Sequence, residues 1–349
     1  MRIAEVAPLF ESVPPALYGG TERVVAYLTD ELVAQGHDVT LFASGDSRTS
    51  AALVPVSPRA LRLDPTCRDH LAWHVLMTEL VAAQTDMFDV IHFHIGFIHF
   101  PLVRRLAVAH VTTLHGRLDL PELVPLYDEF SDMPVISISD AQRAPLPNAR
   151  WVATIPHGLP DRLLGFHPGP NAYLAFLGRI SPEKRADRAI AIATALGWPL
   201  KIAAKVDRAD AEYFEQEIRP LLDNPLVDYI GEIGEADKDS FLGGARALLF
   251  PIDWPEPFGL VMIEALACGT PVVAFRGGSV EEILEHGVSG YIVDTLDEAI
   301  EATRRVDSID RRACRRAFER RFTSRRMAQD YVASYERIIE QRAAHTAAF

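Results

Sequence analysis

Short apolar runs alternate with amphipathic segments along most of the chain. Within 21–35 and within about 69–83, apolar residues recur at helical spacing, which predicts one helix in each segment. The run 172–177 is apolar without interruption, as a strand of a parallel sheet covered on both faces requires. Strands that alternate with helices predict an α/β protein built on parallel sheets. The predicted strands cover residues 2–7, 37–43, 89–94, 111–114, 135–140, 152–158, 172–177, 200–206, 227–233, 247–250, 271–275 and 289–293.

Chain length and turn-forming residues predict two domains. A chain of 349 residues is long for one hydrophobic core and fits two domains of ordinary size. The segment 159–171 is rich in Pro and Gly, and we expect it to be the linker. We therefore predict an N-terminal domain over 1–165 and a C-terminal domain over 166–323. Apolar residues at helical spacing predict a final helix within the remaining segment, 324–349.

The most informative stretch of the sequence runs from 248 to 275. Two apolar runs enclose a loop framed by Pro and Gly, followed by a helix predicted over 260–267. Pro257 disfavours helical geometry at the residue before it, so Glu256 should lie in that loop, and Glu264 follows about two turns into the helix. Carboxylates accept hydrogen bonds from several neighbouring hydroxyls, and the amides at a helix start suit an anion. A sugar joined to a nucleoside diphosphate offers both kinds of group.

This stretch resembles the Glu, seven residues, Glu motif of the retaining glycosyltransferases of family 4, and the resemblance extends along nearly the whole chain. It implies the GT-B fold, in which two Rossmann-like β/α/β domains face each other across a deep cleft and a C-terminal helix crosses back to the N-terminal domain. It also implies transfer of a hexose from a nucleotide-diphosphate sugar to a hydroxyl acceptor with retention of configuration. The chain departs from the family at His157, where Asn is usual, and at Pro160, where Asp is frequent.

Two cations stand five residues apart after the apolar run 172–177. Arg179 and Lys184 bracket the loop between this strand and a helix expected to begin near 181–183. A guanidinium and a flexible ammonium can stabilise the negative charge that develops on a departing diphosphate. The family has an Arg and a Lys at this spacing, which implies that they contact the donor diphosphate. We therefore predict that these two cations replace a divalent metal, and we expect no metal site and no required cofactor.

The remaining donor contacts come from helix starts and from the resemblance. Gly19 and Gly20 precede the helix 21–35, where no Cβ hinders the approach of a diphosphate to their amides. The resemblance implies that they close over the diphosphate, and that the family holds its nucleobase at the strand and turn 227–233. We assign the ribose to Glu264 and the transferred sugar to Glu256 and the amides of 258–260. The expected donor-binding residues are Gly19, Gly20, Gly178, Arg179, Lys184, Ile230, Glu232, Glu256, Phe258, Gly259, Leu260 and Glu264.

His115 follows the predicted strand 111–114 and should face the ligand edge of its sheet. The resemblance implies that a His at this position contacts the transferred sugar or the reaction centre. The expected catalytic residues are therefore His115, Arg179, Lys184 and Glu256. Four further residues of the N-terminal half are expected near the acceptor, namely Tyr18, Glu22, Arg23 and His94.

Two other patterns admit a metal interpretation that we do not adopt. His92, His94 and His99 lie close together, but no acid or cysteine stands at a supporting spacing, so a zinc site is not predicted. Residues 237–239 form a literal Asp-x-Asp, which we interpret as capping of a polar helix start away from the donor site.

Composition and net charge limit the expected partners and the expected cellular compartment. A net charge of −13 argues against nucleic acid as a partner, and three cysteines without metal spacing are typical of a reducing compartment. The N-terminal strand is interrupted by Glu5, unlike a signal peptide, and no apolar run approaches the roughly 20 residues that span a bilayer. We expect a soluble, cytoplasmic protein. Ten arginines between 304 and 326 could dock on acidic lipid, but a salt-bridged surface is the favoured interpretation, with membrane contact at most peripheral.

The predicted function is metal-independent hexosyl transfer by a same-face mechanism, from a UDP-glucose-like donor or GDP-mannose to a sugar, polyol, lipid or small metabolite. The alternatives are a sugar-nucleotide epimerase or phosphorylase of GT-B shape and a non-catalytic nucleotide-sugar binding protein. A phosphorylase would need a lysine placed for pyridoxal phosphate, and a binding module would not need the paired Arg/Lys and Glu/Glu. A dehydrogenase would need a GxGxxG motif, which the chain lacks.

Overall fold

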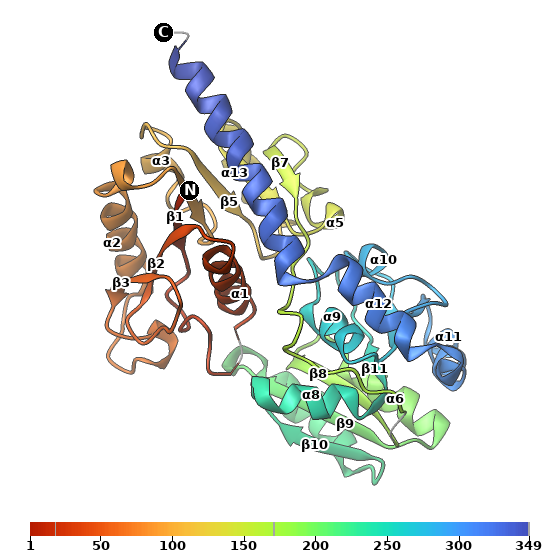
Figure 1. Ribbon diagram of the computed structural model, residues 1–349. Helices are drawn as coiled ribbons and strands as arrows, with labels where there is room; N and C mark the ends of the chain where they lie inside the picture. The colour runs from red at the N-terminus through yellow and green to blue at the C-terminus, as the bar shows by residue number, and fades with distance from the viewer. Residues whose placement is uncertain (18, 170–171, 348–349) are drawn as a thin grey trace. The chain divides into compact units, whose positions relative to one another are not determined.

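The computed structural model describes residues 1–17, 19–169 and 172–347. The chain forms two compact units, one over Met1–Gly158 together with the C-terminal helix that begins at Ser324, and one over Leu159–Thr323. Each unit is built on a parallel β-sheet flanked by helices (Figure 1). The α/β class and the two Rossmann-like domains predicted from the sequence are thereby confirmed.

The N-terminal sheet has seven strands among the described residues, in the order β3-β2-β1-β4-β5-β6-β7. The order reverses between β1 and β4, and ligands bind open α/β sheets at such a reversal, beyond the carboxyl ends of the strands. Glu5 of β1 pairs in register with His92 of β4. The strands are β1 Arg2–Val6, β2 Asp38–Ser44, β3 Ala52–Ser57, β4 Val90–Phe93, β5 His110–Thr113, β6 Pro134–Ser137 and β7 Arg150–Thr154.

Strand β3 was not predicted. It is the edge strand of the sheet and carries Pro55, and its first four residues are exposed or only half-buried. Proline is tolerated at a sheet edge because no ladder hydrogen bond is needed from its nitrogen. Because this segment is short, partly exposed and contains Pro55, it did not stand out as a continuous apolar stretch, and the strand was not predicted.

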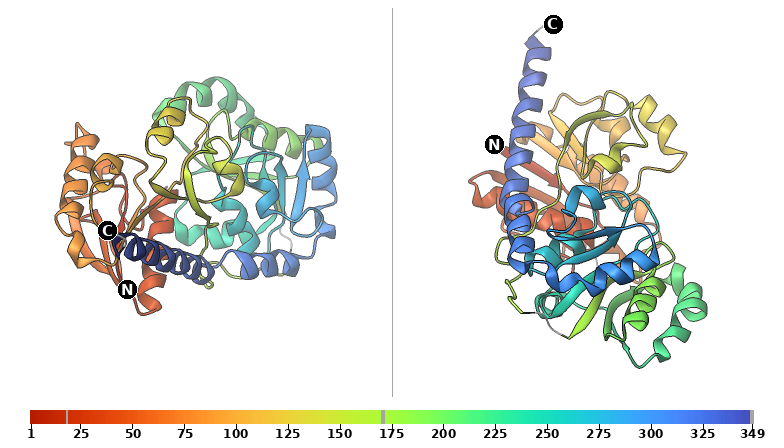
Figure 2. Two further views of the ribbon diagram at one scale, coloured as in Figure 1. Left: turned by 90° about the horizontal axis from the view of Figure 1, so that it is seen from above. Right: turned by 90° about the vertical axis from the view of Figure 1, so that its right-hand side faces the viewer.

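The helix α13 (Ser324–Ala347) packs on the N-terminal unit, as the resemblance implied. Tyr331 hydrogen-bonds through its hydroxyl to Oγ1 of Thr113 at 3.0 Å, and Tyr335 donates to Oε1 of Glu5 at 3.0 Å. Arg326 donates to the carbonyl of Pro156 at 2.6 Å. Both views in Figure 2 show α13, in dark blue, running alongside this unit.

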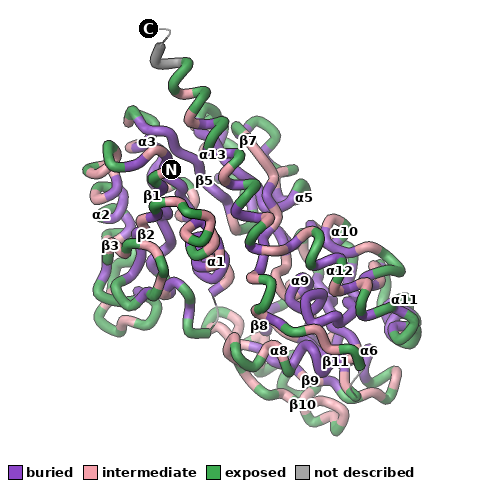
Figure 3. Tube along the Cα trace, in the orientation of Figure 1, coloured by how far each residue is buried: buried purple, intermediate pink, exposed green. Residues whose placement is uncertain are grey.

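The second unit has a six-stranded parallel sheet within its described part, in the order β10-β9-β8-β11-β12-β13. Its order reverses between β8 and β11, so the loops that follow these two strands meet at the carboxyl edge. The inner strand β11 is buried, whereas the edge strand β10 is half-buried or exposed (Figure 3). The strands are β8 Tyr173–Ile180, β9 Leu200–Val206, β10 Val227–Gly231, β11 Ala245–Phe250, β12 Val272–Phe275 and β13 Gly290–Val293.

The connecting helices match the predicted pattern, with one difference at the start of α6. The predicted helices 21–35 and 69–83 are α1 and α2, and the side chain of Asp69 caps α2. However, α6 begins at Ala186 and not near 181–183, because Ser181–Lys184 form a turn and Arg185 adopts a left-handed conformation with φ of 54°. The helices are α1 Gly20–Ala34, α2 His70–Ala82, α3 Phe100–Val103, α4 Leu123–Glu129, α5 Asp140–Arg143, α6 Ala186–Leu196, α7 Ala211–Tyr213, α8 Glu235–Gly243, α9 Leu260–Ala267, α10 Val280–Ile283, α11 Leu296–Arg304 and α12 Arg311–Arg321.

Some arginines between 304 and 326 form ion pairs at the surface, and others bond to buried main-chain carbonyls. Arg316 and Arg320 form exposed ion pairs with Asp310 and Glu285, as predicted for a salt-bridged surface. Arg311, by contrast, is buried and donates to three main-chain carbonyls and to Thr270. This part of the region is therefore structural, since it satisfies carbonyl groups that the fold buries. Among the helices that the structure describes, none is long and apolar enough to cross a membrane.

Candidate active site

Arg179 lies within β8, one residue before its end, and is surrounded by acidic side chains. Its guanidinium lies 3.2 Å from Oε1 of Glu183 and 3.4 Å from Oδ2 of Asp207, with Asp210 at 3.9 Å. Because β8 neighbours β11 at the reversal of strand order, this cation lies at the edge where a ligand is expected. Arg179 is about one quarter exposed, so it remains accessible to a diphosphate.

The structure brings Lys184 and Glu256 into direct contact. The Nζ of Lys184 forms an ion pair with Oε2 of Glu256, and the indole Nε1 of Trp254 donates to the same oxygen at 3.0 Å. The ammonium also lies 4.9 Å from the centre of the Trp254 ring, within the range of a cation–π interaction. The sequence analysis assigned Lys184 and Glu256 to one site. They are 72 positions apart in the sequence, and the structure places their side chains in contact.

The loop that carries Glu256 is fixed by the segment 277–279. The amide of Ser279 donates to the carbonyl of Glu256 at 2.9 Å, and its hydroxyl donates to the carbonyl of Phe258 at 2.7 Å. A Cβ at Gly278, whose φ is +54°, would lie 2.1 Å from the carbonyl oxygen of Glu256, so only glycine fits there. Gly259, with φ of +81°, then starts α9, whose first amides have no partner within the helix.

The second carboxylate, Glu264, has a partner that the sequence analysis missed. Lys238 on α8 places its Nζ 2.6 Å from Oε1 of Glu264 and 3.5 Å from Oε2 of Glu235. Glu264 lies on α9 and is 3% exposed. Nothing in the local sequence marks Lys238, because the contact joins two helices and depends on the tertiary fold.

The interpretation of 237–239 as a capping segment was wrong. Gly234 is the N-cap of α8, and this residue makes no side-chain cap hydrogen bond. Asp239 instead accepts from the amide of Gly165 at 2.6 Å and lies 3.2 Å from Nε2 of His167. The segment therefore anchors the chain entering this unit through Asp239 and supports Glu264 through Lys238.

The remaining donor candidates of this unit lie at a strand end. Ile230, 41% exposed, is the last residue but one of β10, which ends at Gly231, whose φ of 76° turns the chain, and Glu232 follows. Gly178 lies within β8, one residue before Arg179. A base bound near Ile230 would meet an exposed apolar side chain and the main chain of an edge strand.

In the N-terminal unit, Gly19 and Gly20 stand at the start of α1, as predicted. A Cβ at Gly19 would lie 2.8 Å from the side chain of Pro15, so packing alone already favours glycine. Tyr18 lies outside the described residues. Arg23 is buried and donates to the carbonyl of Leu17 at 2.6 Å.

Glu22, in the first turn of α1, is a buried acid. Its pKa is raised to about 7, mainly by burial and also by the neighbouring Glu11, against the opposing effects of backbone donors and Arg62. Glu11 itself pairs with Arg62 at 2.9 Å. Glu22 can therefore exchange a proton near neutral pH, whereas an exposed glutamate could not.

His115 ends a buried chain of hydrogen bonds that starts at Glu5. Nε2 of His94 lies 2.7 Å from Oε2 of Glu5, and Nδ1 of His94 lies 2.8 Å from Nε2 of His115. His92 lies 3.3 Å from Glu5 and 2.7 Å from Oγ1 of Thr113. Burial raises the pKa of Glu5, but the attraction and hydrogen bonds of His92 and His94 outweigh it and lower that pKa to about 2. The imidazole of His115 has a pKa well below 6.5, because of burial and of His94 and His157 nearby.

The acid that the zinc interpretation required is present, although the sequence spacing did not reveal it. Glu5, His92 and His94 place their ligand atoms within 4.8 Å of one another. Their separations are nevertheless those of hydrogen bonds, and Tyr335 lies 2.6 Å from Nδ1 of His92, the nitrogen that faces Glu5. His99 is not part of this group, since its Nε2 bonds to Thr112 at 2.8 Å. The cluster is best described as a satisfied hydrogen-bond network.

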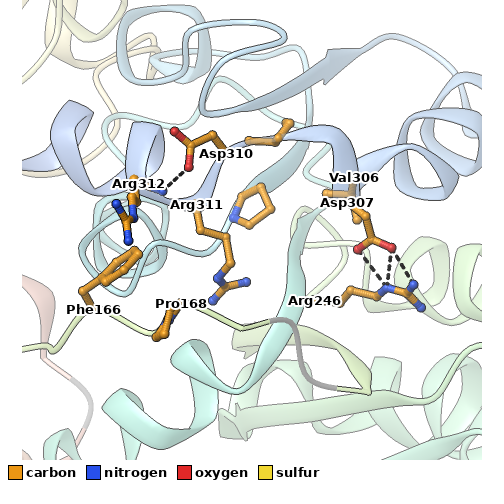
Figure 4. Close-up of a pocket in the computed structure, with 10 residues that line it drawn as sticks. Phe166, Pro168, Arg246, Val306, Asp307, Asp310, Arg311 and Arg312 are labelled. Carbon is orange, nitrogen blue, oxygen red and sulfur yellow. Dashed lines mark hydrogen bonds and ion pairs between the residues drawn. The ribbon is translucent and has the colours of Figure 1, made fainter.

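A separate pocket of about 330 Å³ lies in the second unit (Figure 4). Several of its charged residues have protein partners: Arg246 pairs with Asp307, and Arg311 donates to main-chain carbonyls. None of the predicted site residues lines it. The lining residues are Phe166, Pro168, Arg246, Pro271, Val306, Asp307, Ile309, Asp310, Arg311 and Arg312.

Comparisons with known proteins show which family and fold the chain has. Residues 18–197 match the family described as Glycosyltransferase Family 4, and residues 165–316 match Glycosyl transferases group 1. The D-inositol 3-phosphate glycosyltransferase of Thermobispora bispora is 28% identical over 325 residues, covering 76% of this chain and 74% of that protein. The crystal structure of a glycosyltransferase involved in avilamycin A biosynthesis is 26% identical, with a TM-score of 0.74 and coverage of 97% of this chain and 98% of that one. The structure of Anabaena HepE in complex with UDP and glucose has the same fold, with a TM-score of 0.74, 18% identity and coverage of 96% and 99%.

The two Rossmann-like units and the site at the β8/β11 edge define a glycosyltransferase of the GT-B fold. The chain belongs to glycosyltransferase family 4. The family and the enzyme class predicted from the sequence are thus confirmed.

Proposed function

We propose that this enzyme transfers a hexose from a nucleoside-diphosphate sugar to a hydroxyl acceptor, with retention of configuration and without a metal ion. The observation that carries the proposal is the contact between Lys184 and Glu256 at the β8/β11 edge, beside Arg179. It brings a cation suited to a diphosphate next to a carboxylate suited to sugar hydroxyls, the two kinds of group that one donor molecule carries.

Each part of the donor has a residue of matching chemistry. Arg179 and Lys184 would bind the diphosphate, and Glu256 with the amides at the start of α9 would bind the sugar hydroxyls. Glu264 would accept from the ribose hydroxyls while Lys238 balances its charge. Donor binding would replace the protein's internal ion pairs at Arg179 and Lys184 with pairs to phosphate oxygens.

The transfer step needs little from the protein beyond positioning and charge stabilisation. The bond between the anomeric carbon and the phosphate oxygen breaks as the acceptor oxygen bonds to that carbon from the same face. The acceptor proton passes to an oxygen of the leaving phosphate. Arg179 and Lys184 stabilise the charge that develops on the diphosphate, which is the role that a divalent metal has in other transferases.

UDP-glucose is the first donor to test. HepE, which shares the fold, was solved with UDP and glucose, and this similarity supports a uridine nucleotide as the starting point. GDP-mannose is the second. The D-inositol 3-phosphate glycosyltransferase relative makes a phosphorylated polyol a reasonable first acceptor.

The test is an assay of nucleotide release and product structure in EDTA. The enzyme is incubated with each donor and with inositol phosphate, glucose or a glucan, and the anomeric configuration of the product is read by NMR. The proposal predicts an α-linked product from an α-linked donor, and loss of at least about a hundredfold in turnover for Lys184→Met. Arg219→Met removes an exposed arginine of the same unit and is the control. An inverted product, a trapped glycosyl-enzyme, or activity that only magnesium restores would contradict the proposal.

A further inference from the structure

The chain of bonds from Glu5 to His115 has a fixed direction. Glu5 is on β1, His94 directly follows β4, and His115 follows β5, so the sheet brings together three residues far apart in sequence. Oε2 of Glu5, Nε2 and Nδ1 of His94, and Nε2 of His115 lie in that order, at 2.7 Å and 2.8 Å across the two contacts. Glu5 and His94 are both buried.

The position of each hydrogen follows from the ends of this chain. An ionised carboxylate only accepts, so Nε2 of His94 must carry the hydrogen that points to Glu5. A neutral imidazole has one N–H, which leaves Nδ1 of His94 as an acceptor and requires Nε2 of His115 to donate to it. The remaining nitrogen of His115, Nδ1, therefore carries a lone pair and no hydrogen.

The charge states that this assignment needs are those the surroundings favour. The pKa of Glu5 is about 2, so it is ionised at neutral pH. Burial and the nearby His92 lower the pKa of His94 to about 4 despite Glu5, so His94 is neutral. The low pKa of His115 also makes this ring a poor proton acceptor in the reaction, which leaves hydrogen bonding as its function.

Nδ1 of His115 is a buried acceptor with no hydrogen-bond partner among the residues that the structure describes. The ring of His157 lies against its face, with centroids 5.2 Å apart and planes 18° apart, so that contact is a stacking one. Buried polar atoms in native proteins are nearly always bonded, and the exceptions call for an explanation such as a ligand. A group that donates a hydrogen bond would satisfy this nitrogen.

We propose that Glu5 and His94 are positioning residues that hold His115 in the Nε2–H tautomer, so that its Nδ1 accepts a hydrogen bond from a hydroxyl of the sugar substrate. The identity of that hydroxyl rests on the proposed function, whereas the tautomer does not. Tyr335 of α13 supports the arrangement, because its hydroxyl lies 3.0 Å from Oε1 of Glu5 and fixes the carboxylate from the other side.

Nitrogen NMR of protein labelled with ¹⁵N-histidine tests the tautomer directly, because a protonated and a bare ring nitrogen have well separated shifts. His115→Gln identifies the His115 signals. In the full-length protein at pH 7 and without ligand, we expect a bare Nδ1 and a protonated Nε2 for His115. A protonated Nδ1 would overturn the proposal, whatever the enzyme's activity.

Two variants test the role of the hydrogen bonds that run from Glu5 through His94 to His115. In Glu5→Gln the side-chain amide can either accept or donate, so we expect His115 to sample both tautomers and kcat/KM to fall about tenfold, the effect of one lost hydrogen bond. His94→Asn serves the same purpose if Glu5→Gln does not fold. His110→Gln removes a buried histidine that takes no part in the hydrogen bonds from Glu5 to His115, and it should leave the His115 signals unchanged. An unchanged tautomer in a folded Glu5→Gln and a folded His94→Asn would contradict the positioning role.

Adding the donor separates this proposal from the proposed function. A sugar hydroxyl bonded to Nδ1 should move that nitrogen's signal, whereas the nucleoside diphosphate alone should not. If the tautomer is as assigned but no nucleotide sugar moves the signal, the hydroxyl contact is wrong. If no nucleotide sugar binds at all, the proposed function fails while the tautomer assignment stands.

Discussion

The ammonium of Lys238 on α8 and the carboxylate of Glu264 on α9 form an ion pair at 2.6 Å, with side chains only 13% and 4% exposed. Removal of one partner from a buried pair leaves an uncompensated charge in the protein. Lys238→Met should therefore destabilise the C-terminal unit by about 3 kcal/mol, measured by chemical denaturation. Lys238→Met combined with Glu264→Gln should recover part of this loss, because no lone charge then remains.

The control for this pair is Arg219→Met, which removes an exposed i,i+4 partner of Glu215. Exposed pairs contribute less than about 1 kcal/mol. Equal effects of Lys238→Met and Arg219→Met would show that the Glu264 carboxylate is solvated, contrary to the structure.

Gly278→Ala should disturb the loop that carries Glu256. The new Cβ would lie 2.1 Å from the carbonyl oxygen of Glu256, so this main chain must move. Gly287→Ala is the matched control, because its φ is also positive at +78° but nothing lies within 4 Å of the new Cβ. We expect Gly287→Ala to lose about 1 kcal/mol of stability from the backbone conformation. Gly278→Ala should lose more than that, because of the clash, and should also lose nucleotide-sugar affinity. Comparable affinities for the two variants would refute the supporting role of 277–279.

The buried histidines should make the N-terminal unit less stable in mild acid. The pKa of His94 and of His110 is lowered to about 4, mainly by burial, against 6.5 in the unfolded chain. Between these values the unfolded chain binds a proton on each ring and the folded protein does not, so the free energy of unfolding falls as pH decreases. The slope is about 1.4 kcal/mol per pH unit for each such ring. Glu22, with its pKa raised to about 7, has the opposite effect between pH 7 and 4.5.

Thermal melts from pH 7 to pH 4.5 measure this dependence. His110→Gln should flatten the slope, since it removes one ring and lies outside the Glu5 network. A melting temperature that does not depend on pH in this window would mean that the rings are hydrated in the folded protein.

The two tyrosines of α13 should contribute unequally. The hydroxyl of Tyr335 lies 3.0 Å from the ionised Glu5, whereas that of Tyr331 lies 3.0 Å from the neutral hydroxyl of Thr113. Hydrogen bonds to charged groups are the stronger ones, so Tyr335→Phe should cost about 2 kcal/mol and Tyr331→Phe about 1 kcal/mol. Denaturant titration measures both losses, and about equal losses would indicate that Glu5 is protonated in the folded protein.

Much of the fold could be predicted because parallel strands are continuous apolar runs. The strand β11 and the helix α9 were predicted nearly to the residue, and the rule that loops meet at a reversal of strand order led to Arg179, Lys184 and Glu256. Local signals sufficed there, because each residue stands at the end of an element that the pattern marks.

What the sequence did not reveal depends on contacts between distant segments. Glu5 was interpreted as an interruption of the first strand, yet it lies within β1 and is buried by partners about 87 positions away. Lys238 was passed over because its partner is on another helix. The start of α6 was misplaced because Arg185 adopts a left-handed conformation that non-glycine residues seldom show.

The central claim is that a nucleoside diphosphate binds at Arg179 and Lys184 without a metal. The most direct measurement is thermal stabilisation of the enzyme by UDP, GDP, ADP and TDP, each with magnesium and with EDTA. A ligand at 100 times its Kd should add about 2.7 kcal/mol of stability. The account predicts that one base is preferred, that EDTA changes nothing, and that Arg179→Ala abolishes the shift while Arg219→Ala does not. Stabilisation only with magnesium, or by no nucleotide at all, would contradict it.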